Sequence, residues 1–388
     1  MRRVSCIVLL GVLSNFTSCA QTTPHNGLGI PVLENLWTLN EDAAGHTAVA
    51  WKNVLLAGDF ETEELKAVDL DTHKVLWKRD IDVDTGATIF GEQGDFLFVK
   101  STYSRSQKIL VMNRKGQTLN TIELPGAVLY GQSGNAGPTL VNGLMYLAQN
   151  TSIYVYDVSN PLKKDLEPLW SKTFKHMFAF DVDPSGNVYA SADISTDKEQ
   201  NHLVSFTKEG TQRWSISADV LSPYPHVDIH QIRVEGDVVL TAASGGQLHA
   251  YDTQTGQPKW NAWSSYNTCP GTSAPSASSV LVAEGKIFVV PVSGICVNAF
   301  DLKTGKALWV FSSPNVLTFA SQPAYHNGVL YASNHRLWAI DAETGKPLGV
   351  SGFNMYGTQF NAVVHFDPIR NQILLWGFEG LYAFKPVR

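Results

Sequence analysis

The stretch "AFDLKTGKALWVF" at residues 299–311 has close copies elsewhere in this chain, and their number decides the fold. "AYDTQTGQPKW" stands at residues 250–260, and "AIDAETGKPL" stands at residues 339–348. Looser copies bring the total to eight when they are aligned on the Asp position, which is occupied by Asp69, Asn113, Asp157, Thr207, Asp252, Asp301, Asp341 and Lys385. Successive copies are 40 to 50 residues apart, which is the period of a repeat unit with four strands.

Short turn signals fall between alternating apolar runs, one in each unit. Asn, Asp and Gly accept positive φ, so these dipeptides predict two-residue hairpin turns. The signals are Lys52-Asn53, Gly94-Asp95, Asn142-Gly143, Gly186-Asn187, Gly236-Asp237, Gly285-Lys286, Asn327-Gly328 and Arg370-Asn371. Each unit then has two strands around this turn, a third that ends at the Asp position and a fourth that starts near the Trp. The pattern predicts an all-β fold, a single eight-bladed β-propeller with four-stranded blades.

The two ends of the repeat array predict how the ring closes. The eighth copy, "AFKPVR", reaches Arg388 with no room for a fourth strand, whereas a strand-like stretch, "ENLWTLN", stands at residues 34–40. We expect this N-terminal strand to pair in the last blade, because closure of the ring removes free sheet edges. The propeller domain then spans residues 34–388.

The repeated T-G-K could suggest a nucleotide loop, but a phosphate-binding loop needs an earlier glycine, a following hydroxyl residue and a helix, and no copy has them. In a turn, by contrast, Asp caps backbone amides, Gly takes positive φ, and the Trp packs between blades. The motif residues are therefore predicted to be structural, namely Asp69, Trp77, Asp157, Trp170, Trp214, Asp252, Gly256, Trp260, Asp301, Gly305, Trp309, Asp341 and Gly345.

Composition excludes two classes of protein. With 44% hydrophobic and 16% charged residues over 388 positions, the chain is too apolar for a disordered protein. Its net charge of −6 lacks the basic footprint that a nucleic-acid partner would require.

The N-terminus has the pattern of a secretory signal. Arg2 and Arg3 precede an apolar run from Val4 to Leu13, which is too short to span a bilayer. The segment "FTSCAQ" resembles a bacterial lipobox, so residues 1–19 are predicted to be a lipoprotein-type signal peptide with Cys19 as the lipid anchor, and residues 20–33 a flexible tether. The alternative is cleavage after Ala20 and secretion.

Two cysteines remain in the predicted mature domain. Cys269 and Cys296 fall in loops on the same face of the ring, and outside the cytoplasm such a pair is expected to form a disulfide. Closing a loop of about 28 residues would stabilise the fold by about 3 kcal/mol. Two unpaired buried thiols are the alternative.

The motif A-x-D-x-x-T-G-K-x-x-W resembles the tryptophan-docking repeat of the quinoprotein-type (PQQ-like) β-propellers, and the resemblance covers residues 34–388. This family includes dehydrogenases that bind pyrroloquinoline quinone and a non-catalytic lipoprotein of the outer-membrane barrel-assembly machinery. The dehydrogenases resemble one another in an adjacent Cys-Cys pair and a calcium-binding set of Glu, Asn and Asp, which we do not find here. We therefore expect no catalysis, no cofactor and no metal site. A quinone- or calcium-dependent oxidoreductase is the alternative.

Uneven connections predict the binding face. The loops at 99–108, 191–202 and 218–231 are long and lie on one face of the predicted ring, whereas the long turn at 160–168 lies on the other. Arg105, Tyr224, His226 and Asp228 are the predicted partner-binding residues. "PHVDIH" at 225–230 could also ligate a metal or simply form a hydrogen-bonded loop.

The resemblance implies a non-catalytic protein-binding scaffold, an accessory factor in outer-membrane protein assembly. We expect a monomeric ring in the bacterial envelope, anchored at the periplasmic face of the outer membrane. A secreted propeller that binds glycan or cell-wall ligands is a further alternative.

Overall fold

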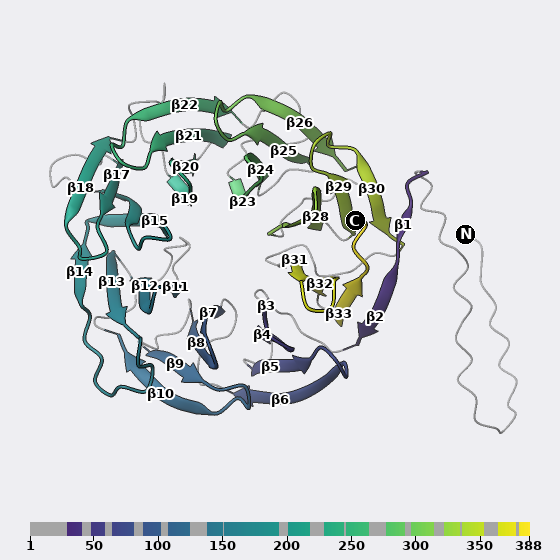
Figure 1. Cartoon of the computed structure of the whole chain (residues 1–388), viewed down its shortest axis with the longest axis horizontal. Coiled ribbons are helices and arrows are strands. Elements are labelled where there is room, and N and C mark those ends of the chain that lie inside the picture. Colours follow the sequence, from purple (N-terminus) through teal and green to yellow (C-terminus); the bar gives the residue numbers. More distant parts are fainter. Residues whose placement is uncertain are drawn as a thin grey trace, which may run out of the picture.

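The computed structural model describes residues 29–40, 48–58, 64–80, 88–101, 108–124, 138–149, 151–193, 201–217, 229–243, 246–263, 277–291, 296–313, 322–333, 336–352, 364–377 and 380–388. In these segments the chain forms eight sheets arranged around a ring (Figure 1). The predicted all-β, eight-bladed propeller is confirmed. Within the described part of the chain, no helix is both long enough and apolar enough to cross a membrane.

Blades 1 to 4 follow one another along the chain, each with its first strand nearest the axis. Blade 1 contains β3 (Ala48–Trp51), β4 (Val54–Gly58), β5 (Glu64–Asp69) and β6 (Lys74–Asp80). Blade 2 contains β7 (Thr88–Gln93), β8 (Phe96–Ser101), β9 (Lys108–Met112) and β10 (Thr118–Glu123). Blade 3 contains β11 (Thr139–Val141), β12 (Leu144–Gln149), β13 (Ser152–Asp157) and β14 (Trp170–Thr173). Blade 4 contains β15 (His176–Val182), β16 (Val188–Asp193), β17 (Asn201–Phe206) and β18 (Gln212–Ser217).

Blades 5 to 8 continue the same order until the last outer strand. Blade 5 contains β19 (Ile229–Glu235), β20 (Val238–Ala243), β21 (Gln247–Asp252) and β22 (Pro258–Trp263). Blade 6 contains β23 (Ala277–Ala283), β24 (Lys286–Pro291), β25 (Cys296–Asp301) and β26 (Ala307–Ser312). Blade 7 contains β27 (Ala324–His326), β28 (Val329–Ser333), β29 (Leu337–Asp341) and β30 (Pro347–Ser351). Blade 8 contains β31 (Val364–Asp367), β32 (Gln372–Gly377) and β33 (Gly380–Phe384), and it is completed by β2 (Asn35–Leu39).

In five of the eight blades the hairpin between the first and second strands turns at the predicted dipeptide, and in three blades it does not. In blade 6 the pairing of Ala283 with Lys286 puts the turn at Glu284-Gly285, one residue earlier than predicted. In blades 4 and 8 the connections 183–187 and 368–371 are longer than two residues. Asp183 is the first residue of one of these turns and Asp367 directly precedes the other, and each carboxylate accepts bonds from backbone N–H groups inside its turn.

The core lies between the blades. Apolar side chains of the described residues form eight clusters, and each cluster joins two neighbouring sheets. Between blades 5 and 6, for example, Phe300 and Leu302 pack with Leu240 and Ala250. Because alternate residues of a strand point to opposite faces, every middle strand is buried on both sides. Packing between blades therefore explains why the middle strands, such as β16 and β20, are buried at every residue.

The ring closes as predicted, with an addition. β2 pairs antiparallel with β33 and supplies the outer strand of blade 8. Just before it, β1 (Val32–Leu33) pairs in parallel with β30 as a fifth strand on blade 7. Val32 and Leu33 were expected to belong to the flexible tether. A two-residue strand has no periodicity of its own, so the sequence pattern gave no sign of it.

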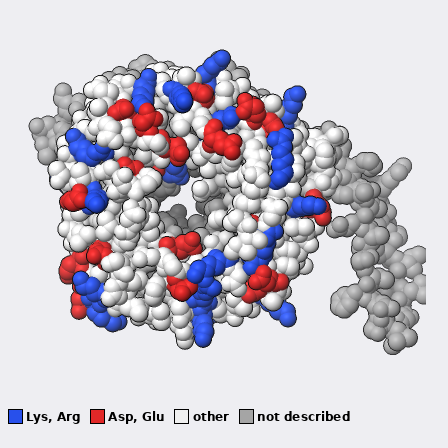
Figure 2. Space-filling view, viewed as in Figure 1, with Lys and Arg blue, Asp and Glu red and all other residues white. Residues whose placement is uncertain are grey.

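Each blade contributes to two faces of the ring. The turn face carries the connections from first to second strands and from third to fourth strands. The loop face carries the ends of the second and fourth strands. Figure 2 shows one face of the ring, where basic and acidic side chains are interspersed around the central opening. Among the described residues on that face, the two signs of charge are therefore mixed.

Candidate functional site

The repeated turn is held together by its Asp side chain. In blade 6 the Asp301 carboxylate accepts hydrogen bonds from Thr304 N at 2.8 Å and Thr304 Oγ1 at 2.7 Å. The bonds from Thr304 hold the pKa of Asp301 below its usual value. Blades 1, 5 and 7 repeat this cap with Asp69, Asp252 and Asp341. In each blade the Thr that donates these bonds lies within the turn itself, so these carboxylates shape the backbone.

The Trp that follows the turn contacts the next blade. Trp309 Nε1 donates to the Ala342 carbonyl oxygen at 3.0 Å, and its ring lies against Gly345, where a Cβ would come within 2.6 Å of Trp309 Cδ2. Gly345 also has a φ of +71°, which an L side chain rarely adopts. Four other pairs have the same arrangement of ring, glycine and carbonyl, namely Trp77 with Gly116, Trp170 with Gly210, Trp214 with Gly256 and Trp260 with Gly305.

Strand register identifies the equivalent residue, here called the docking position, in all eight blades. It is the outer-strand residue that pairs with the third-strand residue two positions before the Asp position. It is occupied by Trp77, Asn120, Trp170, Trp214, Trp260, Trp309, Gly349 and Trp37. Two blades therefore lack the Trp, and in both the structure shows what replaces it.

In blade 2 the docking position is Asn120, which the repeat motif alone does not mark. Its Nδ2 donates to the carbonyl oxygens of Pro161 at 3.0 Å and Lys163 at 2.9 Å, both in the long turn of blade 3. Lys164 Nζ in turn donates to Asn120 Oδ1 at 3.3 Å. The long turn at 160–168 is thus held by a small amide where a Trp would fill the space.

In blade 7 the docking position is Gly349, and an N-terminal side chain takes the place of the Trp. Leu33 from β1 is 7% exposed and lies so close that any Cβ at Gly349 would clash with it. Val350 N donates to the Pro31 carbonyl oxygen at 3.0 Å, which fixes the added strand. The missing Trp of this copy and the extra strand β1 are therefore two parts of one arrangement.

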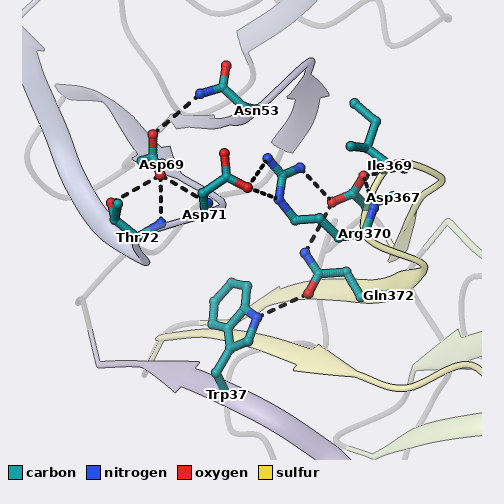
Figure 3. A network of polar contacts seen from close by, with 9 residues as sticks. All are labelled: Trp37, Asn53, Asp69, Asp71, Thr72, Asp367, Ile369, Arg370 and Gln372. Carbon is teal, nitrogen blue, oxygen red and sulfur yellow. Dashed lines mark hydrogen bonds and ion pairs between the residues drawn. The ribbon is translucent and has the colours of Figure 1, made fainter.

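The contact between blades 8 and 1, here called the closure joint, differs from the others (Figure 3). The Trp37 ring stacks on His73, with centroids 4.1 Å apart, and His73 occupies the glycine position of the first turn at a φ of 56°. Trp37 Nε1 donates to Gln372 Oε1 of its own blade at 3.0 Å. Arg370 spans the joint, because its Nη2 lies 2.7 Å from Asp71 Oδ1.

Several polar contacts on the turn face also join neighbouring blades. Lys52 Nζ lies 2.7 Å from Asp95 Oδ1, Lys286 Nζ lies 2.8 Å from Glu343 Oε2, and Arg388 Nη2 lies 2.7 Å from Asp341 Oδ2. Most of these side chains are well exposed, so each pair contributes little to stability on its own. Their partners are other blades of the same chain, which favours a structural role for this belt of charges.

Near the axis, side chains of inner strands bond to the backbone of the next inner strand. Asp181 Oδ2 accepts from Val234 N at 2.9 Å, and Gln231 Oε1 accepts from Val280 N at 3.2 Å. Burial raises the pKa of Asp181, even though the charge of Arg233 and the bond from Val234 oppose the shift. These groups tie blades 4, 5 and 6 together and leave no convergent acid and base pair among them.

His249 is the described histidine with the largest shift. It is 2% exposed, its Nε2 lies 3.1 Å from Gln247 Oε1, and burial lowers its pKa to about 4. The imidazole is therefore neutral at pH 7. Its other nitrogen has no hydrogen-bond partner among the described residues, and no nucleophile is bonded to either nitrogen there. This geometry fits a core histidine.

The predicted partner-binding and covalent sites fall largely outside the described residues. Cys19, Arg105, Tyr224, His226, Asp228 and Cys269 all lie there. Cys296 is described: it is fully buried at the start of β25, with its Sγ 3.4 Å from Ser312 Oγ. The disulfide, the lipid anchor and the binding loop remain predictions. Among the described residues, no group of three or more His, Cys, Asp or Glu side chains is placed to hold a metal ion.

Comparisons with known proteins place this ring among its relatives. The family model described as "Outer membrane protein assembly factor BamB" matches residues 61–348. Among curated proteins, no sequence matches the chain. Solved structures with a similar fold include BamB from Moraxella catarrhalis, which is 13% identical with a TM-score of 0.65 over 91% of this chain and 99% of that one.

Two further structures share the architecture. The computationally designed Ika8 protein is 14% identical, with a TM-score of 0.65 over 92% of this chain and 99% of its own. Sqt1 from Saccharomyces cerevisiae is 12% identical, with a TM-score of 0.68 over 92% of this chain and 100% of its own. At such identities the structures show the fold alone. The family model, in contrast, spans most of the repeat array, and the chain belongs to the family of outer membrane protein assembly factor BamB.

Proposed function

We propose that this protein is a non-catalytic protein-binding scaffold that acts as an accessory factor in outer-membrane protein assembly. The observation that carries the proposal is the family match over residues 61–348, which includes seven of the eight repeated turns. The joints support it, because they hold the blades in a fixed ring while the connections between them differ in length and sequence. A rigid ring with variable loops presents binding surfaces without needing a reaction centre.

The proposed location is the periplasmic face of the outer membrane, with Cys19 as a lipidated N-terminus. The sequence pattern at residues 1–19 supports this, and the described part of the chain begins at the outer rim, beside blade 7, where a tether can leave without crossing either face. The loop face is the proposed partner-binding surface, with Arg105, Tyr224, His226 and Asp228 as candidate contacts.

A pull-down from gently solubilised membranes tests the role. The full chain should recover an outer-membrane barrel protein or its assembly partners, and mass spectrometry of the N-terminal peptide should show acylated Cys19. The Cys19→Ala variant should lose membrane association but keep the partner in a soluble extract. Consistent absence of any barrel-assembly protein from the recovered material would count against the proposal.

The oxidoreductase alternative has its own readout. Adding pyrroloquinoline quinone and calcium to the purified chain and recording absorbance and dye reduction would reveal a quinoprotein. Stoichiometric quinone binding would replace the scaffold role with a catalytic one.

A further inference from the structure

The outer strand of each blade is a potential site for pairing with another chain. In the described part of the chain, β6, β10, β14, β18, β22, β26 and β2 each end their sheets, whereas β30 is covered by β1. An edge strand presents N–H and C=O groups that no neighbouring strand satisfies, and proteins usually protect such edges with charges, prolines or short length. The edges of this ring differ in how well they are protected.

The chain itself shows that this rim accepts an added strand. β1 pairs with β30 in parallel, with Val32 opposite Val350 and Leu33 opposite Ser351. The Leu33 side chain is buried against the Gly349 position, while Val32 remains 43% exposed. At blade 7, where Gly349 leaves room at the docking position, a short extended segment with one apolar side chain turned inward occupies the edge; at β26 the docking position holds Trp309, so an added strand would rely on backbone pairing and on the outward side chains. The two neighbouring edges along the ring are β26 of blade 6 and β2 of blade 8.

β26 has the least protected sequence of the open edges. Its six residues, "ALWVFS", carry no charge and no proline. Five other open edges are protected: β6 carries Lys74, Lys78, Arg79 and Asp80, β10 carries Glu123, β14 carries Lys172, β18 carries Arg213, and β22 carries Pro258 and Lys259. β2 is also uncharged, and a charged residue directly precedes each of the two strands, Glu34 before β2 and Lys306 before β26. β2 differs in its polar residues Asn35 and Thr38, and Asn35 Nδ2 donates to the Trp37 carbonyl oxygen at 3.3 Å.

The exposed side chains of β26 alternate along the strand. Leu308 is 41% exposed and Val310 is 37% exposed, so two apolar side chains point to the same side at strand spacing. Trp309 and Phe311 point the other way, into the cluster between blades 6 and 7. A strand added to β26 would place its alternate side chains beside Leu308 and Val310.

We propose that β26 is an acceptor edge for an extended, uncharged segment with apolar residues at alternate positions, of the kind found in β-strands that have not yet paired. This rests on the proposed scaffold function and names one class of client for it. Backbone hydrogen bonds along β26 supply the affinity, and Leu308 and Val310 select the apolar side chains.

Fluorescence anisotropy with the full-length protein in mild detergent tests the proposal. The probe is a dye-labelled peptide of the same length as β26 in which Thr and Val alternate. Val310→Lys should weaken binding by at least about tenfold, because it places a charge on the edge. Leu119→Lys is the control: Leu119 is an apolar residue of another outer strand, β10, and it is 39% exposed against 37% for Val310, so the same charge placed there should leave the affinity unchanged within about twofold.

Two further measurements separate strand pairing at β26 from adhesion of the peptide elsewhere on the ring. The same peptide with N-methylated backbone amides cannot pair as a strand and should not bind. Val310→Thr keeps the β-branched shape and the fold, and it should weaken binding by about threefold. Equal binding of the methylated peptide, or equal losses in Leu119→Lys and Val310→Lys, would overturn the proposal.

Sedimentation velocity of the protein alone tests the competing occupant. Dimerisation that disappears in Val310→Lys would show that a second copy of the chain occupies β26, and this would also overturn the proposal. Failure of the scaffold role is a different result, because the pull-down would then recover no assembly protein while the peptide still bound to β26.

Discussion

The joint between blades 6 and 7 and the closure joint between blades 8 and 1 both hold neighbouring blades together, but they use different contacts. At the first, Trp309 packs on Gly345 and donates to the backbone of the next blade. At the second, Trp37 stacks on His73 and donates within its own blade, and the ion pair of Arg370 with Asp71 crosses the gap. A regular joint is thus set by backbone geometry, whereas the closure joint depends on side-chain pairs. The two should respond differently to substitution and to salt.

Removing the docking Trp should have the largest effect. We expect Trp309→Ala to lower the free energy of unfolding by about 4 kcal/mol, because a large ring and an inter-blade hydrogen bond are both lost. Trp37→Ala should cost about 2 kcal/mol, since its indole N–H bonds within blade 8. Urea denaturation of the two variants measures both values. Partner recovery by refolded Trp309→Ala should be unchanged in specificity, and an equal or larger loss in Trp37→Ala would contradict the comparison.

The second largest loss of stability is expected when a methyl group is added at Gly345, the glycine beneath the Trp309 ring. Gly345→Ala should cost about 3 kcal/mol, from the positive φ and from the clash with the Trp309 ring. Gly285 is the matched control, because it has the same φ of +71° and nothing within 4 Å of its Cβ direction. Gly285→Ala should cost about 1 kcal/mol. Similar denaturation midpoints for the two variants would show that the ring contact contributes little.

The ion pair should contribute less and depend on salt. A double-mutant cycle with Asp71→Asn and Arg370→Gln should give a coupling energy of about 1 kcal/mol across the closure joint. The value should fall as sodium chloride is raised, since Asp71 is largely exposed. The Trp309 contact contains no charge, so the stability loss of Trp309→Ala should not change over the same salt range. A salt-independent coupling energy would argue against the ion pair as the link.

The smallest effect is expected from the turn caps. The pKa of Asp301 is lowered in the folded state, so its charge stabilises the fold above about pH 4 and loses this effect as the pH falls through the lowered pKa. Asp301→Asn should lower the free energy of unfolding by only about 0.5 kcal/mol at pH 7, because the carboxylate is partly exposed. The stability difference between the variant and the parent protein should vanish in acid. Blade 2 has Asn113 at this position, so Asn113→Asp is the reciprocal variant and should gain acid sensitivity. Denaturation midpoints across pH check both.

The sequence was sufficient for the ring because the blade motif is local. Asp301, Thr304 and Gly305 form one turn, and eight such turns at a regular period specify the number of blades. Two hairpin turns are longer than predicted, because the Asp183 and Asp367 carboxylates cap them. An Asp followed by Pro in a turn is the local signal for such a cap.

The exceptions could not be predicted, because each depends on residues far apart in sequence. The role of Asn120 depends on its bonds to carbonyl groups of the blade 3 turn, and the role of Gly349 depends on its contact with Leu33. His73 at the glycine position was visible in the aligned copies, and it is the one signal that could have marked the closure joint. The binding loops and Cys19 remain predictions from sequence, because they lie outside the described residues.

The N-terminal segment that completes blades 7 and 8 has a consequence for the order of folding. Asn35 and its partner Ala383 are separated by 348 positions, so β1 and β2 are synthesised long before the strands that receive them. Loop closure over such a distance is slow compared with hairpin formation inside a blade. We therefore expect blades to form one by one while the ring stays open, with Leu33 and Trp37 exposed to solvent and chaperones. Leu33 can be buried once β30 has been made, but only a chain made to its last strand can bury Trp37, so completion of synthesis and closure of the ring become a single kinetic event.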